Sequence, residues 1–336
     1  MDLNSQIQQV FSWILTLSAQ KDYQALTHHF LALLMNLAGV HRAVAYEMHS
    51  QTNKRTGDVG SVQEQLVIRF PLDFTKEENE RHNHLLDKLD DTCDINTGEP
   101  DRNGFYPWTI LSITGSNGPD RAILIEGELG MALVSLLSRL REFYRNLVIL
   151  HDIKERDVLT RLSNRQSLES RLLSVWEHYN SHPITDNKQQ KCSWVAILDI
   201  DHFKRINDNF GHLYGDEVLL IFSQIMTRTF RHNDFLFRFG GEEFVVILNL
   251  ATRAGAEIAL NRFREAIANH HFPAVGKVTV SIGVTHIDRA YMQTTLLDHA
   301  DKALYLAKET GRNKVVVYDD MTDTAGESGE DAIEFF

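Results

Sequence analysis

The chain has 336 residues, a formal net charge of -12 at pH 7 and a sequence pI near 5.7, and at about 150 residues per domain this length predicts two domains. The charge argues against a surface of clustered Lys and Arg that binds nucleic acids, so a bound nucleotide would have to be held by local geometry. The two cysteines, Cys93 and Cys192, stand outside any paired metal-binding or redox spacing, which fits a reducing cytoplasm.

Residues 1–130 predict a sensory domain in which helices precede an antiparallel sheet. Apolar residues at helical spacing predict helices over Ile7–Leu17 and Leu26–Leu37. Apolar or alternating runs predict strands at 44–48, 65–70, 108–114 and 121–126, with a turn over 116–120. This layout resembles a GAF domain, with a PAS-like domain as the alternative. The resemblance implies a small-molecule signal whose identity the sequence does not reveal.

Histidines are frequent in this half, and neighbours such as His28 and His29 could hold a haem or a metal. Because no two of the histidines form a recognised ligand motif, we interpret them as surface or capping residues.

Residues 131–157 predict a long exit helix that serves as a signalling linker. Its apolar residues alternate at spacings of three and four, as in a coiled-coil seam: Leu133, Leu136, Leu140, Phe143, Leu147 and Leu150. We therefore expect a homodimer paired along this helix, with packing on the sensor's own sheet as the alternative. The most apolar segment, Met131–Leu140, is too short to span a bilayer, and the N-terminus lacks a signal-peptide pattern. We expect a cytoplasmic protein with no membrane span.

Residues 158–319 predict a second α/β domain with a central mixed sheet of βαββαβ type. Strands are expected at 194–200, 235–239, 243–248, 278–285 and 314–318, and helices at 216–231, 254–269 and 296–310. Gly240 and Gly241 separate the strands at 235–239 and 243–248, which predicts a hairpin. Residues 320–336 form an acidic tail that we expect to be disordered.

Four acidic residues stand at strand ends in this domain. Asp199 and Asp201 end an apolar strand, and Glu242 and Glu243 begin another after the glycine turn. If the strands are neighbours, the carboxylates converge and repel one another unless a hard cation lies among them. Mg²⁺ takes carboxylate oxygens together with substrate phosphates, as phosphoryl and nucleotidyl transfer require. The alternative for any one of them alone is a solvated cap.

The run from Leu198 to Glu217, LDIDHFKRINDNFGHLYGDE, is polar and interrupted by glycines, so we do not expect an ordinary helix there. Asn207 and Asp216 within it suit the guanine edge, because a carboxylate can accept from both N1–H and the 2-amino group.

Four motifs together identify a family. RFGGEEF, the run just described, DVLTRLSNR at the domain entrance and AKETGRNKV near its end resemble the GGDEF family of diguanylate cyclases over about Asp157–Tyr318. The resemblance implies a homodimer that condenses two GTP into cyclic di-GMP and releases two pyrophosphates. It also implies dependence on Mg²⁺, with Mn²⁺ as an alternative. Glu stands here where the family name has Asp, which keeps the carboxylate.

The resemblance also implies roles for individual residues. The metal ligands would be Asp199, the carbonyl of Ile200, Glu242 and Glu243. Glu242 and Glu243 would be the catalytic pair, with Glu242 deprotonating the ribose 3'-hydroxyl. The substrate contacts would be Asn207 and Asp216 for guanine, His212 in the pocket, Lys204, Lys308 and Arg312 for phosphate, and Gly240 and Gly241 for close backbone approach.

A possible inhibitory site precedes the glycine turn. Arg231 and Asp234 match the family's RxxD motif, and Arg262 on the following helix could add a second arm. Arginine can pair bidentately with guanine or phosphate, so we expect product feedback by cyclic di-GMP. The alternative is an exposed Arg and Asp at a helix end.

Two other functions remain open. One is a non-catalytic receptor for GTP or cyclic di-GMP, which the complete set of acidic residues disfavours. The other is a different nucleotide cyclase, which the guanine-reading pair disfavours.

Overall fold

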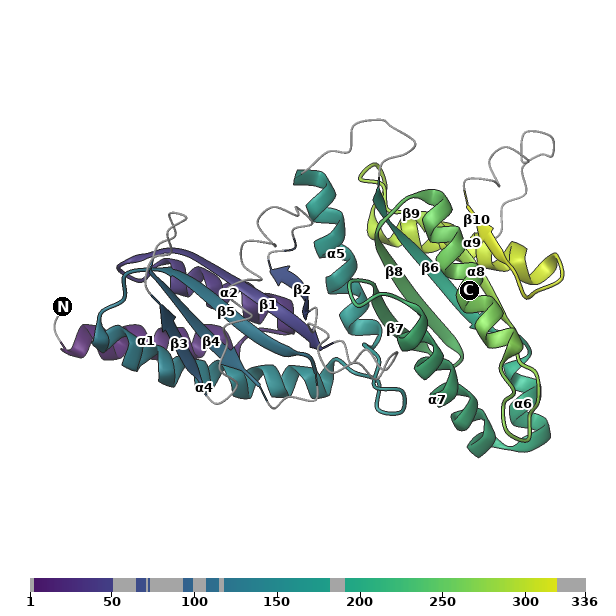
Figure 1. Ribbon diagram of the computed structural model, residues 1–336, viewed down its shortest axis with the longest axis horizontal. Helices are drawn as coiled ribbons and strands as arrows, with labels where there is room; N and C mark the ends of the chain where they lie inside the picture. Colours follow the sequence, from purple (N-terminus) through teal and green to yellow (C-terminus); the bar gives the residue numbers. More distant parts are fainter. Residues whose placement is uncertain are drawn as a thin grey trace, which may run out of the picture. The chain divides into compact units, whose positions relative to one another are not determined.

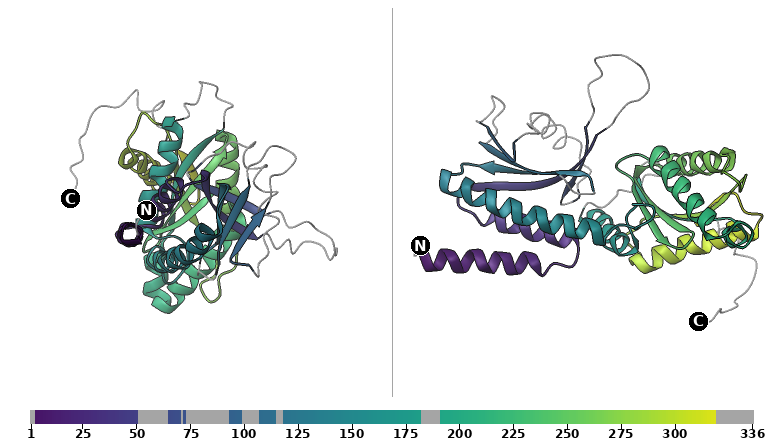
Figure 2. Two further views of the ribbon diagram at one scale, coloured as in Figure 1. Left: turned by 90° about the vertical axis from the view of Figure 1, so that its left-hand side faces the viewer. Right: turned by 90° about the horizontal axis from the view of Figure 1, so that it is seen from below.

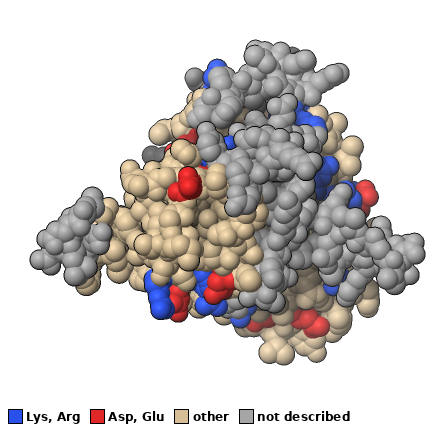
Figure 3. All heavy atoms as spheres, turned by 60° about the vertical axis from the view of Figure 1, so that its left-hand side comes forward, with Lys and Arg blue, Asp and Glu red and all other residues tan. Residues whose placement is uncertain are grey.

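A computed structural model describes residues 3–50, 65–70, 72, 93–98, 107–114, 118–181 and 191–318 (Figure 1). The chain separates into two compact units, Met1–Arg156 and Asp157–Phe336. The predicted tail at 320–336 and part of the predicted turn at 116–120 lie outside the described residues. No described helix is both long and apolar enough to cross a membrane. Along the lower edge of the view in Figure 3, coloured Lys and Arg lie beside Asp and Glu.

The first unit contains an antiparallel sheet preceded by helices, as the sequence predicted, and its helices lie along one face of the sheet (Figure 2). The sheet order is β2-β1-β5-β4-β3. Among the described elements of this unit, β3 alone lacked a prediction, because its short INTG sequence has no apolar alternation. The elements are α1 (Leu3–Ser18), α2 (Tyr23–Met35), β1 (Val40–Ser50), β2 (Gln65–Phe70), β3 (Ile95–Gly98), β4 (Trp108–Ile113), β5 (Asp120–Gly127) and α4 (Met131–Lys154).

The exit helix α4 packs within its own unit. Leu137, Tyr144 and Val148 are its most buried apolar residues. Of the predicted seam, Leu140 is also buried, whereas Leu150 is 61% exposed and the other members are partly buried. Packing against its own unit, the alternative weighed above, is therefore what the described residues adopt. Pairing of the seam with a second copy stays a prediction.

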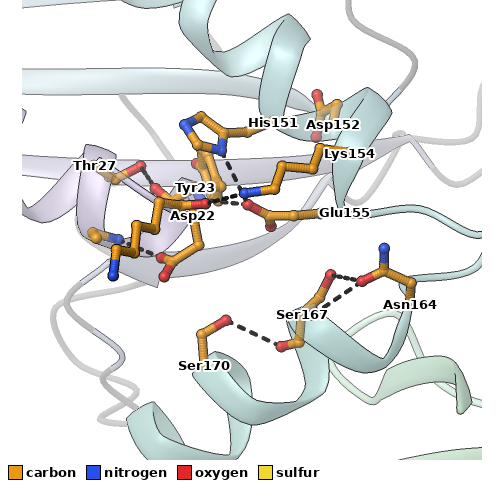
Figure 4. Close-up of polar contacts among 12 residues, drawn as sticks. Asp22, Tyr23, Thr27, His151, Asp152, Lys154, Glu155, Asn164, Ser167 and Ser170 are labelled. Atoms are coloured by element: carbon orange, nitrogen blue, oxygen red, sulfur yellow. Dashed lines mark hydrogen bonds and ion pairs between the residues drawn. The ribbon is translucent and has the colours of Figure 1, made fainter. Parts of the chain in front are cut away.

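The last turns of α4 are tied to the rest of this unit by polar contacts. Arg121 on β5 donates two hydrogen bonds to Asp152, at 2.8 and 2.7 Å, and both side chains are buried. Glu155, just after α4, accepts a hydrogen bond from the backbone N–H of Tyr23 at 2.6 Å. Tyr23 begins α2, and the positive end of this helix dipole also stabilises a carboxylate. Figure 4 shows Lys154 and Glu155 pointing toward the start of α2.

The second unit contains the predicted mixed sheet. Its order is β10-β9-β6-β8-β7, with β10 parallel to β9 and the other neighbours antiparallel. The long helix α5 had no prediction. The elements are α5 (Arg165–Ser181), β6 (Cys192–Ile200), α6 (Phe203–Phe210), α7 (His212–Thr229), β7 (Phe235–Gly240), β8 (Glu243–Ala251), α8 (Arg253–Asn269), β9 (Val280–His286), α9 (Gln293–Glu309) and β10 (Val315–Val317).

The two faces of this sheet have different partners. Alternate residues of β6, including Trp194, Ala196 and Leu198, join the core formed with α7 and α8. The opposite face is covered by α9, which can approach β9 closely because Gly283 has no side chain. A Cβ at Gly283 would lie 2.1 Å from the carbonyl oxygen of Ala300. Asp199 belongs to this second face.

The expectation that residues 198–217 avoid ordinary helix is wrong. After the end of β6 this run forms α6 and the beginning of α7. Polarity misled the prediction, because α6 buries only Phe203 and Ile206 and exposes most of its polar residues. The break between the helices is Gly211, whose φ of +88° suits glycine. Helix α7 therefore begins at His212, before the predicted start.

Candidate active site

The pairing of β6 with β8 brings three carboxylates to one end of the sheet. Asp199 lies directly opposite Glu243 in the antiparallel register, and Glu242 precedes Glu243 in the hairpin. The backbone N–H of Ile200 donates to the carbonyl of Glu242 at 3.4 Å. The strand order thus places Asp199, Ile200, Glu242 and Glu243 together, as expected from neighbouring strands.

Asp201 lies close enough to this cluster for its charge to help raise the pKa of Asp199, as the expected convergence requires, but its carboxylate has hydrogen-bond partners of its own. Its buried carboxylate accepts hydrogen bonds from Thr279 Oγ1 at 2.6 Å, Ser281 Oγ at 2.7 Å and the N–H of Asn313 at 3.1 Å. Asp201 follows the last residue of β6, so its side chain no longer obeys the strand's alternation. It holds the chain near Asn313.

A lysine from α9 completes the carboxylate cluster. Lys308 Nζ lies 2.8 Å from Asp199 Oδ2. Burial raises the pKa of Asp199, although Lys308 acts in the opposite direction. Burial and then the charge of Asp199 raise the pKa values of Glu242 and Glu243. Burial is thus the main reason that these carboxylates bind protons more readily than usual, and repulsion within the cluster adds to it.

The donors of this cluster fit Mg²⁺ in one specific manner. Among the described residues, no three His, Cys, Asp or Glu side chains are gathered so that they could hold a metal ion as they stand. Mg²⁺ does not need such a cage, because it commonly binds one or two carboxylates together with substrate phosphates. Carboxylate and carbonyl oxygens are hard ligands of the required kind. The cluster therefore fits a metal that is completed by a phosphate-bearing substrate.

The glycine turn leaves open space beside the carboxylates. Gly241 has a φ of +49°, and a Cβ added to Gly240 or Gly241 would meet no atom within 4 Å. A ligand can therefore approach this backbone closely. The carbonyl of Gly241 accepts hydrogen bonds from Arg238 Nε at 3.1 Å and from a terminal nitrogen of the same guanidinium at 2.9 Å.

Arg238 also ties the hairpin to the domain entrance, a role that the sequence reasoning missed. It lies 3.0 Å from Asp157, whose carboxylate also accepts the N–H and hydroxyl of Thr160, each at 2.7 Å. A cleft of about 380 Å³ beside the turn is lined by Asp157, Asn164, Arg165, Gln166 and residues 238–241. The motifs DVLTRLSNR and RFGGEEF contained the signal, because both supply residues to this cleft.

The predicted guanine readers stand on two consecutive helices. Asn207 lies near the end of α6, and His212 and Asp216 lie in the first turns of α7, both exposed. A Cβ at Gly215 would be 2.0 Å from Asn207 Oδ1, so the absent side chain makes room for this amide against α7. Lys204, a predicted phosphate ligand, is exposed on α6, whereas Lys308 stands on α9.

The predicted phosphate ligand Arg312 stands in an unusual loop after α9. Gly311, Arg312 and Asn313 have φ values of +112°, +60° and +46°, which is costly for residues other than glycine. Asn313 is held on its backbone by Asp201 and on its side-chain oxygen by Arg264, at 3.1 Å in both cases. Arg312 is close enough to lower the pKa of Asp199, so the loop places a second cation near the cluster.

The predicted inhibitory residues surround one turn between α7 and β7. Arg231 and Arg262 are exposed, whereas Asp234 is buried. Asp234 accepts the N–H groups of Arg231 and Asn249, each at 3.0 Å. Arg262 donates to the carbonyl of Thr229 at 2.7 Å. Asp234 therefore folds the turn, and the two arginines present guanidinium groups at its surface.

Comparisons with known proteins agree on the second unit. Residues 154–314 match the family model described as "Diguanylate cyclase, GGDEF domain". The chain is 36% identical over 202 residues to diguanylate cyclase DgcP of Pseudomonas aeruginosa, covering 57% of this chain and 29% of that protein. It is 38% identical over 180 residues to the probable diguanylate cyclase DgcT of Escherichia coli, covering 52% and 38%. The chain thus spans less than half the length of either relative. The solved structure of diguanylate cyclase SiaD from Pseudomonas aeruginosa, in complex with its activator SiaC, is 32% identical, covering 55% of this chain and 70% of that one, with a TM-score of 0.48.

Proposed function

We propose that this chain is a diguanylate cyclase that condenses two GTP into cyclic di-GMP and releases two pyrophosphates, since residues 154–314 match the GGDEF family model. The observation that carries the proposal is the register of β6 and β8, which places Asp199 opposite Glu243 beside an open glycine turn. Nucleotidyl transfer needs such carboxylates next to space for a triphosphate.

Each catalytic residue has a separate task in this proposal. Glu242, whose pKa is raised by burial and by Asp199, takes the proton from the ribose 3'-hydroxyl, since a base works best when its pKa approaches the working pH. Asp199, the carbonyl of Ile200 and the Glu242/Glu243 pair would hold Mg²⁺ or Mn²⁺, which when bound supplies charge neutralisation at the phosphate. Lys308 neutralises further negative charge from α9.

Substrate selection would come from the remaining groups. Asn207 and Asp216 read the guanine edge, with His212 in the same pair of helices. Lys204 and Arg312 bind phosphate oxygens, and Gly240 and Gly241 let the backbone approach the nucleotide. These residues are far apart in the sequence and stand on α6, on α7, in the glycine turn and in the loop after α9.

Two copies of the chain would be needed for one product. Each 3'-oxygen attacks the α-phosphate of the other GTP, and one such domain holds one GTP. A homodimer paired along the predicted seam of α4 would hold two domains at high effective concentration. The seam residues that α4 does not bury against its own unit leave apolar surface for this pairing. They are Leu133, Leu136, Phe143, Leu147 and Leu150.

Regulation would have two sources. The first unit, with its antiparallel sheet and flanking helices, would be a GAF-like sensory domain for a small molecule, and α4 would carry its signal to the second unit. Cyclic di-GMP would act as feedback inhibitor at Arg231, Asp234 and Arg262, where two exposed guanidinium groups flank one turn.

The test is to incubate the purified chain with GTP and Mg²⁺ and to separate the nucleotides by chromatography. The double variant Glu242→Ala/Glu243→Ala should form no cyclic di-GMP. A matched control, Glu309→Gln, removes an exposed carboxylate at the end of α9 and should retain activity. Cyclic di-GMP from the natural chain and the control alone supports the proposal. GTP binding without turnover in the folded, dimeric chain would instead indicate a non-catalytic receptor.

A further inference from the structure

The turn formed by residues 231–234 rests on a buried asparagine of the neighbouring strand. Asn249, on β8, is 1% exposed. Its backbone N–H donates to Asp234 Oδ1 at 3.0 Å, and its side-chain amide donates to the carbonyl of Asn233. Both hydrogen bonds end on residues of the turn, so the position of Asn249 fixes the path of that backbone.

Asn249 is itself held by two further buried hydroxyl groups. Ser193, on β6, is completely buried and donates its hydroxyl hydrogen to Asn249 Oδ1 at 2.8 Å. Its oxygen lies 2.9 Å from the hydroxyl of Tyr179 on α5. Because Ser193 has only one hydroxyl hydrogen, Tyr179 must be the donor in that contact. Burial raises the pKa of Tyr179 to about 12, so it keeps its proton at ordinary pH.

These hydrogen bonds therefore form a series in which every donor points toward the turn. Tyr179 donates to Ser193, Ser193 donates to Asn249, and Asn249 donates to the turn. Each buried polar group is satisfied only while its neighbour stays in place, because an unmatched buried donor or acceptor is costly. The backbone next to Asn249 also has an unusual conformation. Leu250, the following residue, has a φ of +52°, which is uncommon for a leucine.

The arginines of the turn depend on this support. Arg231 is the first residue of the turn, and its N–H is bound by the same Asp234 carboxylate that accepts from Asn249. Arg262 holds the carbonyl of Thr229, two residues before Arg231. A shift of the turn would change the direction of the exposed Arg231 relative to Arg262, and bidentate recognition by arginine is sensitive to such a change.

We propose that Asn249 is a positioning residue for product feedback, which it controls by holding the turn that presents Arg231 to cyclic di-GMP, with Ser193 and Tyr179 as its supports. The inference deepens the proposed regulation and rests on it. It predicts that feedback can be weakened from inside the domain without touching the carboxylate cluster or any residue exposed at the turn.

The experiment measures cyclic di-GMP binding by calorimetry and initial rates from GTP on the same full-length variants. Asn249→Ala should weaken cyclic di-GMP binding about tenfold, the effect of losing one well-placed hydrogen bond, while KM and kcat stay within about twofold. Tyr179→Phe, which removes only the outermost hydroxyl, should fold like the natural chain and weaken binding less. Ser193→Ala should lie between them.

Ser223→Ala is the matched control, because Ser223 is also buried but donates only to the carbonyl of Leu220 within α7. It should leave cyclic di-GMP binding unchanged. Unaltered binding in the Asn249, Ser193 and Tyr179 variants would overturn the inference, as would an equal loss of kcat/KM. Absence of cyclic di-GMP binding by the natural chain would also overturn it. That outcome is distinct from failure of the proposed activity, which the GTP reaction reports separately.

Discussion

The ammonium nitrogen of Lys308 lies 2.8 Å from Oδ2 of Asp199. The carboxylate that the family resemblance assigns to the metal is therefore paired with a cation of the chain itself. A metal and this lysine compete for the same oxygen, so each must weaken the binding of the other unless a triphosphate takes up the lysine.

Replacing Lys308 by Met should affect metal binding and catalysis in opposite directions. Without nucleotide, Mn²⁺ should bind roughly fivefold more tightly, because an ion pair worth on the order of 1 kcal/mol no longer competes for the carboxylate. Turnover of GTP should fall, because a phosphate-binding cation is lost. Metal titration and initial rates measure the two effects. Lys302→Met, which breaks an exposed pair with Asp298 on the same helix, should change neither. Weaker metal binding in Lys308→Met would contradict the competition.

Replacing Glu243 by Gln should stabilise the second unit while abolishing activity. The pKa of Glu243 is raised, first by burial and then by Asp199, so the folded state holds this proton more tightly than the unfolded state. The stability that protonated Glu243 contributes is therefore present below the ordinary glutamate pKa and is lost as the pH rises through the raised pKa of the folded state. In the presence of a chelator, the melting temperature of Glu243→Gln should exceed that of the natural chain near neutral pH, and the gap should shrink in acid. A lower melting temperature near neutral pH would count against this reading.

Replacing Asp201 by Asn should raise the KM for GTP more than it lowers kcat. The amide lacks the negative charge and one acceptor oxygen, so the hydrogen bonds from Thr279 and Asn313 lose their charged acceptor and the contact with Ser281 must reverse its direction. Loss of a buried charged hydrogen bond costs about 1–3 kcal/mol, and the strained loop that carries Arg312 should loosen. Steady-state kinetics would separate the two constants. A loss confined to kcat would instead place Asp201 in the chemical step.

Replacing Asp157 by Asn should destabilise the second unit in a pH-dependent way. Burial alone would raise the pKa of Asp157, but hydrogen bonds from Thr160 and Arg238 outweigh it and lower the pKa. Such a group stabilises the folded state above its unfolded pKa, and the effect is lost as pH falls through the folded value. Urea unfolding should show a loss of about 1 kcal/mol near neutral pH, since the pair is partly exposed. The same loss at low pH would show that the charge is irrelevant.

Replacing Asp152 by Ala should destabilise the first unit by about 3 kcal/mol, because it leaves the guanidinium of Arg121 buried without its main partner. The double variant Arg121→Met/Asp152→Ala should recover part of this loss, since the buried guanidinium is removed and only Glu47, 3.6 Å from Arg121 Nε, then loses a charged partner. Denaturant unfolding of the natural chain and both variants gives the comparison. A double variant less stable than Asp152→Ala would refute the account.

Local patterns in the sequence were sufficient for most helices and strands. Apolar spacing predicted α2, α4, β6 and β8, and the pair Gly240-Gly241 predicted the hairpin of β7 and β8, because periodicity and backbone freedom are properties of neighbouring residues. The same reasoning missed α5 and misjudged α6. Helix α6 needs only Phe203 and Ile206 to anchor it, too few apolar residues for a recognisable pattern.

By itself, the sequence determined the resemblance of the second unit to a family model, over residues 154–314, and the chemical types available at the end of β6. Only the tertiary structure separated Asp199, which faces Lys308, from Asp201, which holds a loop. The two acids are nearly adjacent, but their partners stand on other elements, up to 112 residues away in the case of Asn313. A carboxylate's task depends on which donors surround it, and those donors are brought together only when the sheet and α9 pack.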